Sequence, residues 1–285
     1  MLKLAIINLD TGEIVRSFTG KTYDTIRQQR QYLEKYNAKL MDNNCRDFIW
    51  ILYDVSQELY PNIQPQDITR LMYIVTYLGY EGYLVYDNHI SMNKKGVYNK
   101  LNISRKQCDR FYQTMIDNNI FIEQNNKIYI NQECFSRGRI YQATKYKKDI
   151  IKLYTNTVRN IYEKIPVQSH KHFGYIFKIL PFVNQQYNIV CKNPQEQKYS
   201  EIEPLSLEEL CDIIHYTSKQ RNKIIKELKT DFNINGQPLV RHIIHKTMYK
   251  NGNTKMLFIN PKIYHVGDKW KKLSFWGQKV EFSAE

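Results

Sequence analysis

The chain has 285 residues, 42% of them hydrophobic and 13% aromatic, so it is long enough for two domains and can form folded cores. Its five cysteines are scattered and never spaced as CxxC, which argues against a disulfide framework or a zinc site. No apolar run approaches the roughly 18–20 residues that span a bilayer. The N-terminus also turns polar too early for a signal peptide, so we expect a cytoplasmic protein that contacts no membrane.

The net charge of +14 is unevenly distributed along the chain. Residues 1–66 carry 8 basic and 8 acidic side chains, so the whole excess lies in residues 67–285. A polyanionic partner, most simply nucleic acid, accounts for this excess better than solubility alone. The plain alternative is a solvated basic surface without a nucleic-acid partner.

The first 66 residues predict a β-hairpin followed by helices. Lys3–Phe18 has two β-rich arms around an Asp-Thr-Gly-Glu turn, which is typical of a hairpin. Thr22–Leu40 has apolar side chains at helical intervals and predicts a polar amphipathic helix. Arg46–Tyr60 is more apolar and predicts a second helix that ends before Pro61.

Two ten-residue phrases that start 129 residues apart follow the same pattern. Tyr129–Gly138 reads YINQECFSRG, and Phe258–Gly267 reads FINPKIYHVG. Each has an aromatic residue before Ile-Asn, an aromatic residue four positions after the Asn, and Gly seven positions after it. This repetition indicates one supersecondary unit used twice.

The residues before each phrase contain the same predicted elements. A first helix, a short extended piece, a second helix, a third helix and a hairpin follow one another in both halves. The proposed counterparts are Arg70–Leu78 with His172–Leu180, Asn93–Asn102 with Ser206–His215, Ser104–Asn118 with Thr217–Thr230, and the hairpin turns Glu123–Lys127 with Tyr249–Lys255. This order is that of a winged helix, in which two helices form a helix-turn-helix and the hairpin is the wing.

We therefore predict an α+β fold with tandem winged-helix domains, each a helix-turn-helix plus a β-wing, joined by a helix. The predicted domains are residues 67–140 and 172–285, with a basic connecting helix at 141–171 and an N-terminal β-hairpin and helical region at 1–66. Within the connector, Tyr141–Ile165 predicts one amphipathic helix with an apolar stripe at Ile150, Ile151, Tyr154, Val158, Ile161 and Ile165. A continuous helix of roughly 25 residues would span about 37 Å. It fits a rigid connector, a homodimer helix, or both.

Helix starts in the two halves carry similar capping signals. A hydroxyl residue followed three positions later by Gln or Glu is the pattern of a capping box. Three pairs have this spacing: Ser104–Gln107, Thr217–Gln220 and Ser206–Glu209. The first two occupy the same place in the two predicted repeats and support the alignment.

The third helix of each repeat predicts a DNA-reading face. In the first, the apolar stripe of Cys108, Phe111, Tyr112, Met115 and Ile116 should face the core, which leaves Arg105, Lys106, Asp109, Arg110 and Gln113 outward. The outward set of the second is Ser218, Lys219, Asn222, Lys223 and Lys226. Arg can bridge guanine O6 and N7, and Gln or Asn can pair with adenine, so both faces suit the major groove. On the wings, Lys127, Lys250 and Lys255 are candidates for phosphate contact.

Catalytic patterns are not evident in the sequence. His170 and His172 are separated by Lys, and His242 and His245 are three apart in a β-rich run, so neither pair has the spacing of a nickase metal site. No Walker-type loop occurs. Most of the 23 tyrosines fit core and interface packing. We therefore expect no metal, no cofactor and no enzymatic activity.

Several of these segments together resemble a known family. The run from Asn102 to Asn131, the FSRG that follows, and Phe258–Gly267 are similar to RepL-type plasmid replication proteins and to winged-helix proteins of Gram-positive phages. The resemblance covers about Asp67–Ile140 and His172–Lys269. It implies a winged-helix fold and a mobile-element protein associated with the nucleoid of a bacterial host.

Four functions remain open from the sequence. The expected one is a sequence-specific regulator bound at a promoter or origin of a phage or plasmid. A replication initiator that recruits host replication proteins is the first alternative, because it can use the same module. A phage-encoded inhibitor that binds an acidic host replication or transcription protein is the second, and an enzyme acting on nucleic acid is the third.

Overall fold

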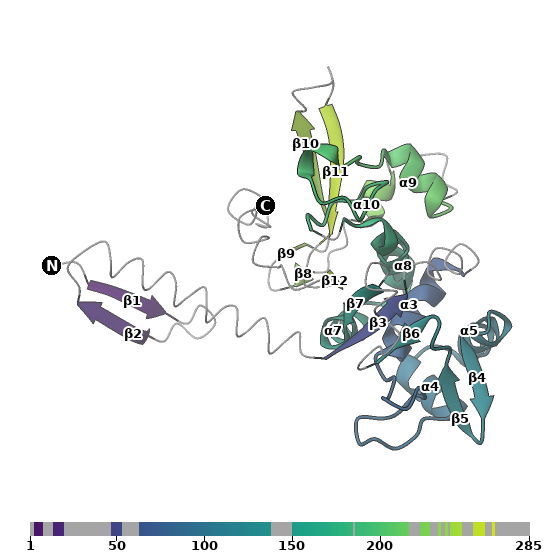
Figure 1. Cartoon of the computed structure of the whole chain (residues 1–285). Coiled ribbons are helices and arrows are strands. Elements are labelled where there is room, and N and C mark those ends of the chain that lie inside the picture. Colours follow the sequence, from purple (N-terminus) through teal and green to yellow (C-terminus); the bar gives the residue numbers. More distant parts are fainter. Residues whose placement is uncertain are drawn as a thin grey trace. The chain divides into compact units, whose positions relative to one another are not determined.

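The computed structural model of the chain describes residues 3–7, 14–19, 47–52, 63–137, 150–184, 186–216, 223–228, 233–234, 237–238, 240–246, 253–259 and 264–265 (Figure 1). They fall into two compact units, residues 1–46 and residues 47–285, which are described separately. The chain is mixed α and β, with small antiparallel sheets. None of the described helices is long and apolar enough to cross a membrane.

The first unit contains a two-stranded hairpin. β1 (Lys3–Ile7) and β2 (Ile14–Thr19) pair antiparallel, with Lys3 opposite Thr19. The hairpin predicted from the two β-rich arms is confirmed. The helix predicted at Thr22–Leu40 lies outside the described residues.

The second unit contains two runs of elements in a shared order. The first run consists of β3 (Phe48–Leu52), α3 (Pro65–Val75), α4 (Lys94–Leu101), α5 (Arg105–Asp117), β4 (Phe121–Gln124), β5 (Lys127–Ile130) and β6 (Phe135–Ser136). The second run consists of β7 (Ile150–Tyr154), α7 (Thr155–Lys164), α8 (His170–Ile179), α9 (Leu207–Ile213), α10 (Lys223–Leu228), β10 (Val240–Lys246), β11 (Asn253–Ile259) and β12 (Tyr264–His265). Short pieces also belong to the second run: η2 (Val167–Ser169), η3 (Leu180–Phe182), η4 (Tyr199–Glu201), β8 (Asn233–Ile234) and β9 (Gln237–Pro238).

Corresponding backbone hydrogen bonds confirm the repeat. In the first run, the Leu84 amide donates to the Ile128 carbonyl at 2.8 Å, and the Ile130 amide donates to the Gly82 carbonyl at 2.9 Å. The corresponding bonds in the second run are Val190 to Leu257 at 2.9 Å and Ile259 to Asn188 at 3.0 Å. In both runs, therefore, a short extended piece after the first helix pairs with the second strand of the hairpin.

The same bonds correct the helix alignment. The Val85 amide donates to the Tyr77 carbonyl, and the Cys191 amide donates to the Phe182 carbonyl, both at 2.8 Å. Because Val85 and Cys191 directly follow the counterparts Leu84 and Val190, Tyr77 corresponds to Phe182. The sequence alignment of Arg70–Leu78 with His172–Leu180 is therefore wrong by three residues. A shift of three residues is nearly one helical turn, so the apolar pattern fits both registers almost equally well.

A four-stranded antiparallel sheet joins the two runs in the order β12-β7-β3-β6. The helix predicted at Arg46–Tyr60 is wrong over β3, because these residues form a strand paired with β7. Burial alternates along β3: Ile49 and Ile51 are buried, and Phe48, Trp50 and Leu52 are half-buried. A short run of β-branched and aromatic residues fits this half-buried strand, and the sequence pattern alone does not separate it from a buried helix.

The single connecting helix predicted at Tyr141–Ile165 is also wrong in part. Its middle, Ile150–Tyr154, is strand β7, and Thr155–Lys164 forms a helix, α7, while residues 141–149 lie outside the described part of the chain. The predicted apolar stripe is consequently divided between a strand and a helix, and Val158 and Ile161 are buried in the core of the same chain. A continuous 25-residue spacer is excluded, and the buried part of the stripe is not available to a second copy.

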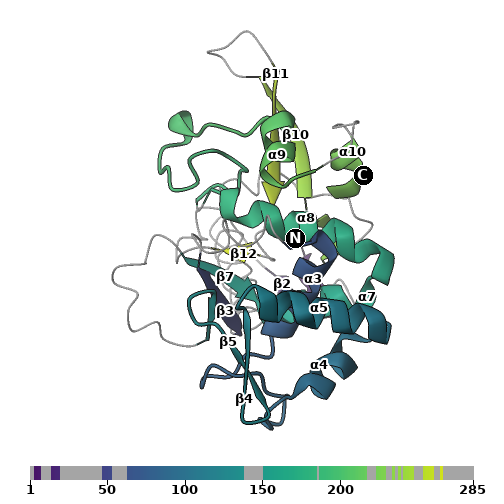
Figure 2. The same cartoon turned by 90° about the vertical axis from the view of Figure 1, so that its right-hand side faces the viewer.

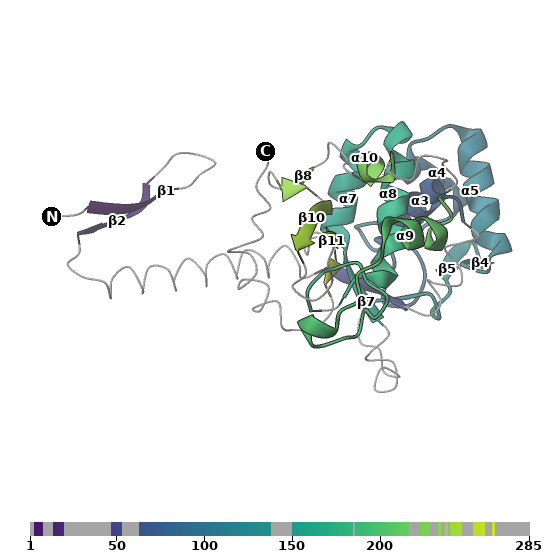
Figure 3. The same ribbon diagram turned by 90° about the horizontal axis from the view of Figure 1, so that it is seen from above.

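Helix α3 and its counterpart in the second run, α8, pack side by side (Figure 2). α7 covers α3 as well, and the rings of Tyr73 and Tyr162 stack with centroids 3.9 Å apart. The β4–β5 and β10–β11 hairpins lie on opposite sides of the α3–α8 pair, as Figures 2 and 3 show. The helix pair thus lies between the two hairpins.

Candidate functional site

A tight turn connects the second and third helices of the first run. α4 ends at the buried Leu101, and Asn102 adopts a left-handed conformation with φ of 49°. Asn tolerates this conformation better than most residues. α5 then begins after Ser104, so three residues separate the two helices. The counterpart after α9 is His215, with φ of 51°.

The predicted faces of α5 are confirmed. The side chains of Cys108, Phe111, Tyr112 and Met115 are buried, and Ile116 packs against the core. The predicted outward residues are all exposed: Arg105, Lys106, Asp109, Arg110 and Gln113. Within the part of the chain that the structure describes, no salt bridge involves the three cations of this set.

The acidic side chains on and beside this face have hydrogen-bond donors of their own. The Tyr98 hydroxyl of α4 donates to Asp109 Oδ1 at 2.5 Å. Two further pairs complete the pattern: Tyr112 Oη donates to Glu123 Oε1 at 2.5 Å, and Gln113 Nε2 donates to Asp117 Oδ1 at 2.8 Å. The carboxylates are thus hydrogen-bonded to neutral groups, and among the described residues none of them forms a salt bridge with a cation of α5.

The two tyrosines are held in their donor form. Burial, and then the hydrogen bond to a carboxylate, raise the pKa of both Tyr98 and Tyr112 above the usual value. The hydroxyls therefore remain protonated at neutral pH. Lys94 Nζ lies 4.6 Å from the ring centroid of Tyr112 and 5.9 Å from that of Tyr98, which adds a cation to the same corner.

The capping box predicted at the start of α5 does not form. Ser104 occupies the N-cap position, but its side chain makes no cap hydrogen bond. Its hydroxyl instead donates to Gln107 Oε1 at 3.1 Å. The box at Ser206 and Glu209 is confirmed in full at the start of α9. The pair Thr217–Gln220 lies outside the described residues.

The first hairpin turns at Asn125 and Asn126, which have φ of 51° and 57°. Two consecutive left-handed residues are the signature of a type I′ turn, which matches the twist of a two-residue hairpin. Lys127 is half-buried, and its Nζ lies 4.1 Å from the ring centroid of Tyr83. The side chain predicted to contact phosphate therefore lies over a tyrosine of the extended piece that precedes α4.

The second run is described less completely. In α10, Lys223 and Lys226 are exposed, and Ile224 and Leu228 are buried, in agreement with the predicted faces. Lys255 lies in β11 opposite Ile244. Four predicted site residues lie outside the described residues: Ser218, Lys219, Asn222 and Lys250.

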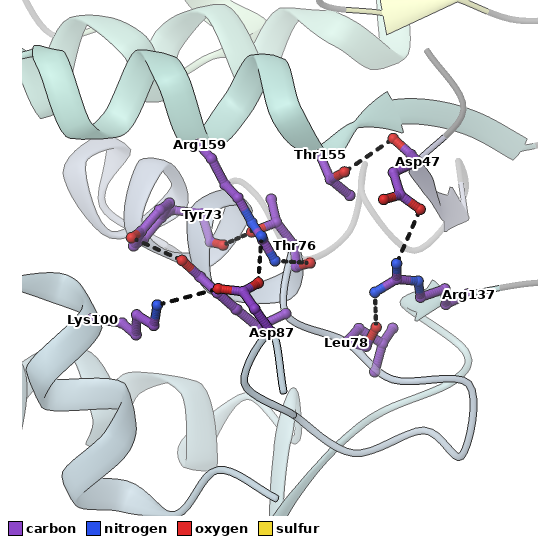
Figure 4. A network of polar contacts seen from close by, with 10 residues as sticks. Asp47, Tyr73, Thr76, Leu78, Asp87, Lys100, Arg137, Thr155 and Arg159 are labelled. Carbon is purple, nitrogen blue, oxygen red and sulfur yellow. Dashed lines mark hydrogen bonds and ion pairs between the residues drawn. The ribbon is translucent and has the colours of Figure 1, made fainter. Parts of the chain in front are cut away.

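A cleft of about 340 Å³ lies beside the C-terminal end of α3, lined by Tyr77, Tyr80, Tyr83, Arg137 and Arg159 among others. Its two arginines are bound by the protein itself (Figure 4). Arg159 donates to the Thr76 carbonyl at 2.9 Å and to Asp87 at 2.8 Å. Arg137 donates to the Leu78 carbonyl at 2.8 Å and to Asp47 at 3.1 Å. These arginines connect α7 and the segment after β6 to the end of α3.

His170 and His172 do not share a ligand geometry. His170 and His172 are two residues apart on α8, and side chains at that spacing point in different directions. Burial, and then the nearby Arg70 guanidinium, lower the pKa of His170 to about 4. Among the described residues, no three His, Cys, Asp or Glu side chains are grouped to hold a metal ion.

The tyrosine–carboxylate contacts were not predicted from the sequence. Tyr98 and Asp109 are 11 residues apart and lie on different helices. Tyr112 and Glu123 are also 11 residues apart and lie on a helix and a strand. The sequence signal that could have indicated them was the position of Asp109 among the outward cations of α5.

Comparison of the chain with protein-family models, curated proteins and solved structures returned no significant match.

Proposed function

We propose that this chain is a tandem winged-helix protein of a phage or plasmid that binds double-stranded DNA sequence-specifically and acts as a regulator at a promoter or origin. α5 and α10 are its reading helices, and the β4–β5 and β10–β11 hairpins are its wings.

The order of elements supports the winged-helix part of this proposal. In each run, a helix, an extended piece, two helices and a hairpin follow one another. The extended piece bonds to the second hairpin strand, at Leu84 and Ile128 in the first run and at Val190 and Leu257 in the second. This pairing makes the hairpin the outer part of a small sheet beside the helix-turn-helix, as a wing requires.

The observation that carries the function is the charge arrangement on α5. Arg105, Lys106 and Arg110 are exposed and form no salt bridge with described residues, and the neighbouring Asp109 is bound by Tyr98. Cations on the N-terminal half of a reading helix are placed where base edges and phosphates of the major groove would lie. An arrangement that binds the carboxylate through a neutral donor, and leaves the cations without a salt bridge among the described residues, favours a polyanionic partner.

The rivals differ in where and what the chain binds. A replication initiator would use the same reading helices at repeated sites within an origin. An inhibitor would use the basic surface against an acidic host protein and would bind no DNA specifically. Selection of bound fragments from the source genome distinguishes these cases, because promoter fragments support the regulator and clustered origin repeats support the initiator.

The direct test measures affinity for a selected duplex over a range of salt concentrations. If about six phosphates are neutralised, log K should fall with log salt with a slope of roughly −5. A scrambled duplex of the same length is the control and should be bound more weakly at every salt concentration. Absence of binding at low salt would overturn the DNA proposal and favour the protein partner.

A further inference from the structure

The strand register relates the two runs in detail. Phe135 and Tyr264 are counterparts, since each stands four positions after the Asn of a repeated phrase. In the sheet, Phe135 lies opposite Ile51, and Tyr264 lies opposite Leu153. Ile51 is therefore the counterpart of Leu153, and the two edge strands are added to the two central strands in the same way.

The two central strands pair symmetrically. With that correspondence, Trp50 is the counterpart of Lys152, and these two residues lie opposite each other. The neighbouring pairs are Ile49 with Leu153 and Ile51 with Ile151. Each of these pairs is the counterpart of the other, since Ile49 corresponds to Ile151 and Ile51 to Leu153. A residue that faces its own counterpart marks an approximate two-fold axis, and such an interface is called isologous.

The helix pair obeys the same relation. The correspondence of Tyr77 with Phe182 makes Pro65 the counterpart of His170, and Thr69 the counterpart of Gly174. A Cβ on Gly174 would lie 1.7 Å from the Pro65 carbonyl oxygen, so α8 approaches the start of α3 closely. In the symmetry-related position, the Thr69 hydroxyl of α3 donates to the His170 carbonyl at 2.7 Å, so α3 likewise approaches the start of α8. Two independent contacts, one in the sheet and one between helices, thus share the symmetry.

The hairpins follow this arrangement. In Figures 1, 2 and 3 the β4–β5 hairpin and the β10–β11 hairpin extend from opposite sides of the α3–α8 pair. A two-fold axis keeps corresponding elements at the same level along itself. An axis that also relates α5 to α10 would place the two helices at the same level and running in opposite senses around it, as the two reading helices of a homodimer do.

We infer that a single copy of this chain binds DNA in the way that a dimer of a helix-turn-helix protein does. α5 and α10 then lie in successive major grooves on one face of the duplex. The substrate is then a duplex with two half-sites in inverted orientation, about one helical turn apart. The half-sites differ in base sequence, since α5 presents Arg105, Lys106 and Arg110 and α10 presents Lys223 and Lys226. This inference rests on the proposed function and adds the orientation, spacing and stoichiometry.

The first experiment determines the orientation of the half-sites. A duplex is selected from a random-sequence library with the full chain, and its contacts are mapped by hydroxyl-radical footprinting and base-modification interference. Two further duplexes are then compared with it: one with the second half-site reversed in place, and one with about 5 bp, half a helical turn, inserted between the halves. We expect each change to lower affinity at least ten-fold, to the level of one half-site alone.

The second experiment assigns each half-site to a helix. Arg105→Ala with Arg110→Ala should remove the protection of one half, and Lys223→Ala with Lys226→Ala should remove that of the other. Lys198→Ala is the control for charge loss, because Lys198 is 72% exposed and lies outside both reading helices. This variant should retain both protected segments.

Sedimentation of the complex measures the number of chains. One chain per duplex, with two inverted protected segments, supports the inference. Half-sites in direct orientation, a single protected segment, or two chains per duplex would overturn it and leave DNA binding as such intact. No binding to any selected duplex would overturn the inference together with the proposed function.

Discussion

The hydroxyl of Tyr98 donates a 2.5 Å hydrogen bond to the carboxylate of Asp109, which stands among the outward cations of α5. The contact joins α4 to α5 and holds the carboxylate toward α4. Asp109 is four residues after Arg105, the spacing at which opposite charges pair on a helix surface. Tyr98 therefore competes with Arg105 for this carboxylate.

Replacing Tyr98 by Phe should weaken binding to the selected duplex about five-fold, because the released Asp109 carboxylate can pair with Arg105 and repel phosphate. The ring contacts of Tyr98 are kept, so the midpoint of urea unfolding should move little. Adding Asp109→Asn to Tyr98→Phe should restore the affinity, since the released group is then neutral. A loss of affinity that Asp109→Asn does not rescue would mean that Tyr98 acts only through packing.

Arg105→Ala and Arg110→Ala should each lower affinity for the selected duplex about 10- to 100-fold if the arginines make bidentate base contacts. Binding to a scrambled duplex should fall much less, because phosphate contacts remain. The measurement is a pair of titrations at one salt concentration, with Lys198→Ala as the variant of equal charge change. Equal losses on both duplexes would reassign the two arginines to phosphate contact.

Gly174→Ala should destabilise the unit formed by residues 47–285 by about 2 kcal/mol or more, because the added Cβ would overlap the Pro65 carbonyl oxygen at 1.7 Å. The free energy of unfolding is measured in urea. Lys171→Ala on the same helix replaces an exposed side chain and should cost less than about 0.5 kcal/mol. Equal small changes in both variants would mean that α3 and α8 separate without cost.

Stability should decrease as the pH falls through the range from about 6.5 to about 4. The lowered pKa of His170, about 4 in the folded protein, means that the unfolded chain binds the proton first. The unfolded state is then favoured increasingly below its own pKa of about 6.5, by up to roughly 3 kcal/mol. Above that pH the residue is neutral in both states and contributes no dependence.

His170→Phe should flatten this part of the pH profile, because it removes the titrating group and keeps an aromatic ring beside Tyr162, whose ring centroid lies 4.6 Å away. The free energy of unfolding is measured at several pH values between 4 and 7. His89→Asn, at an exposed histidine, is the control variant. An unaltered slope in His170→Phe would place the pH dependence on other groups.

Local patterns in the sequence were sufficient for several elements. The apolar stripe of α5 repeats with the helical period, and the side chains it predicted as buried are buried or packed on the core. The capping box of Ser206 and Glu209, and the turn at Asn125 and Asn126, depend on residues only one to three positions apart. Each of these signals is complete within one segment, so the sequence determines it without knowledge of the neighbours.

The tertiary structure decided what the apolar runs at Phe48–Leu52 and Ile150–Tyr154 become. Both runs are five residues long and fit a buried helix or a strand, and each becomes a strand because the other supplies its hydrogen bonds across about a hundred residues of chain. The same holds for the contact of Tyr98 with Asp109 and for the approach of Gly174 to Pro65. The sequence indicated that one order of elements is used twice. Only the tertiary structure paired β3 with β7 and packed α3 against α8, because the partner groups are brought together by the fold and not by their spacing.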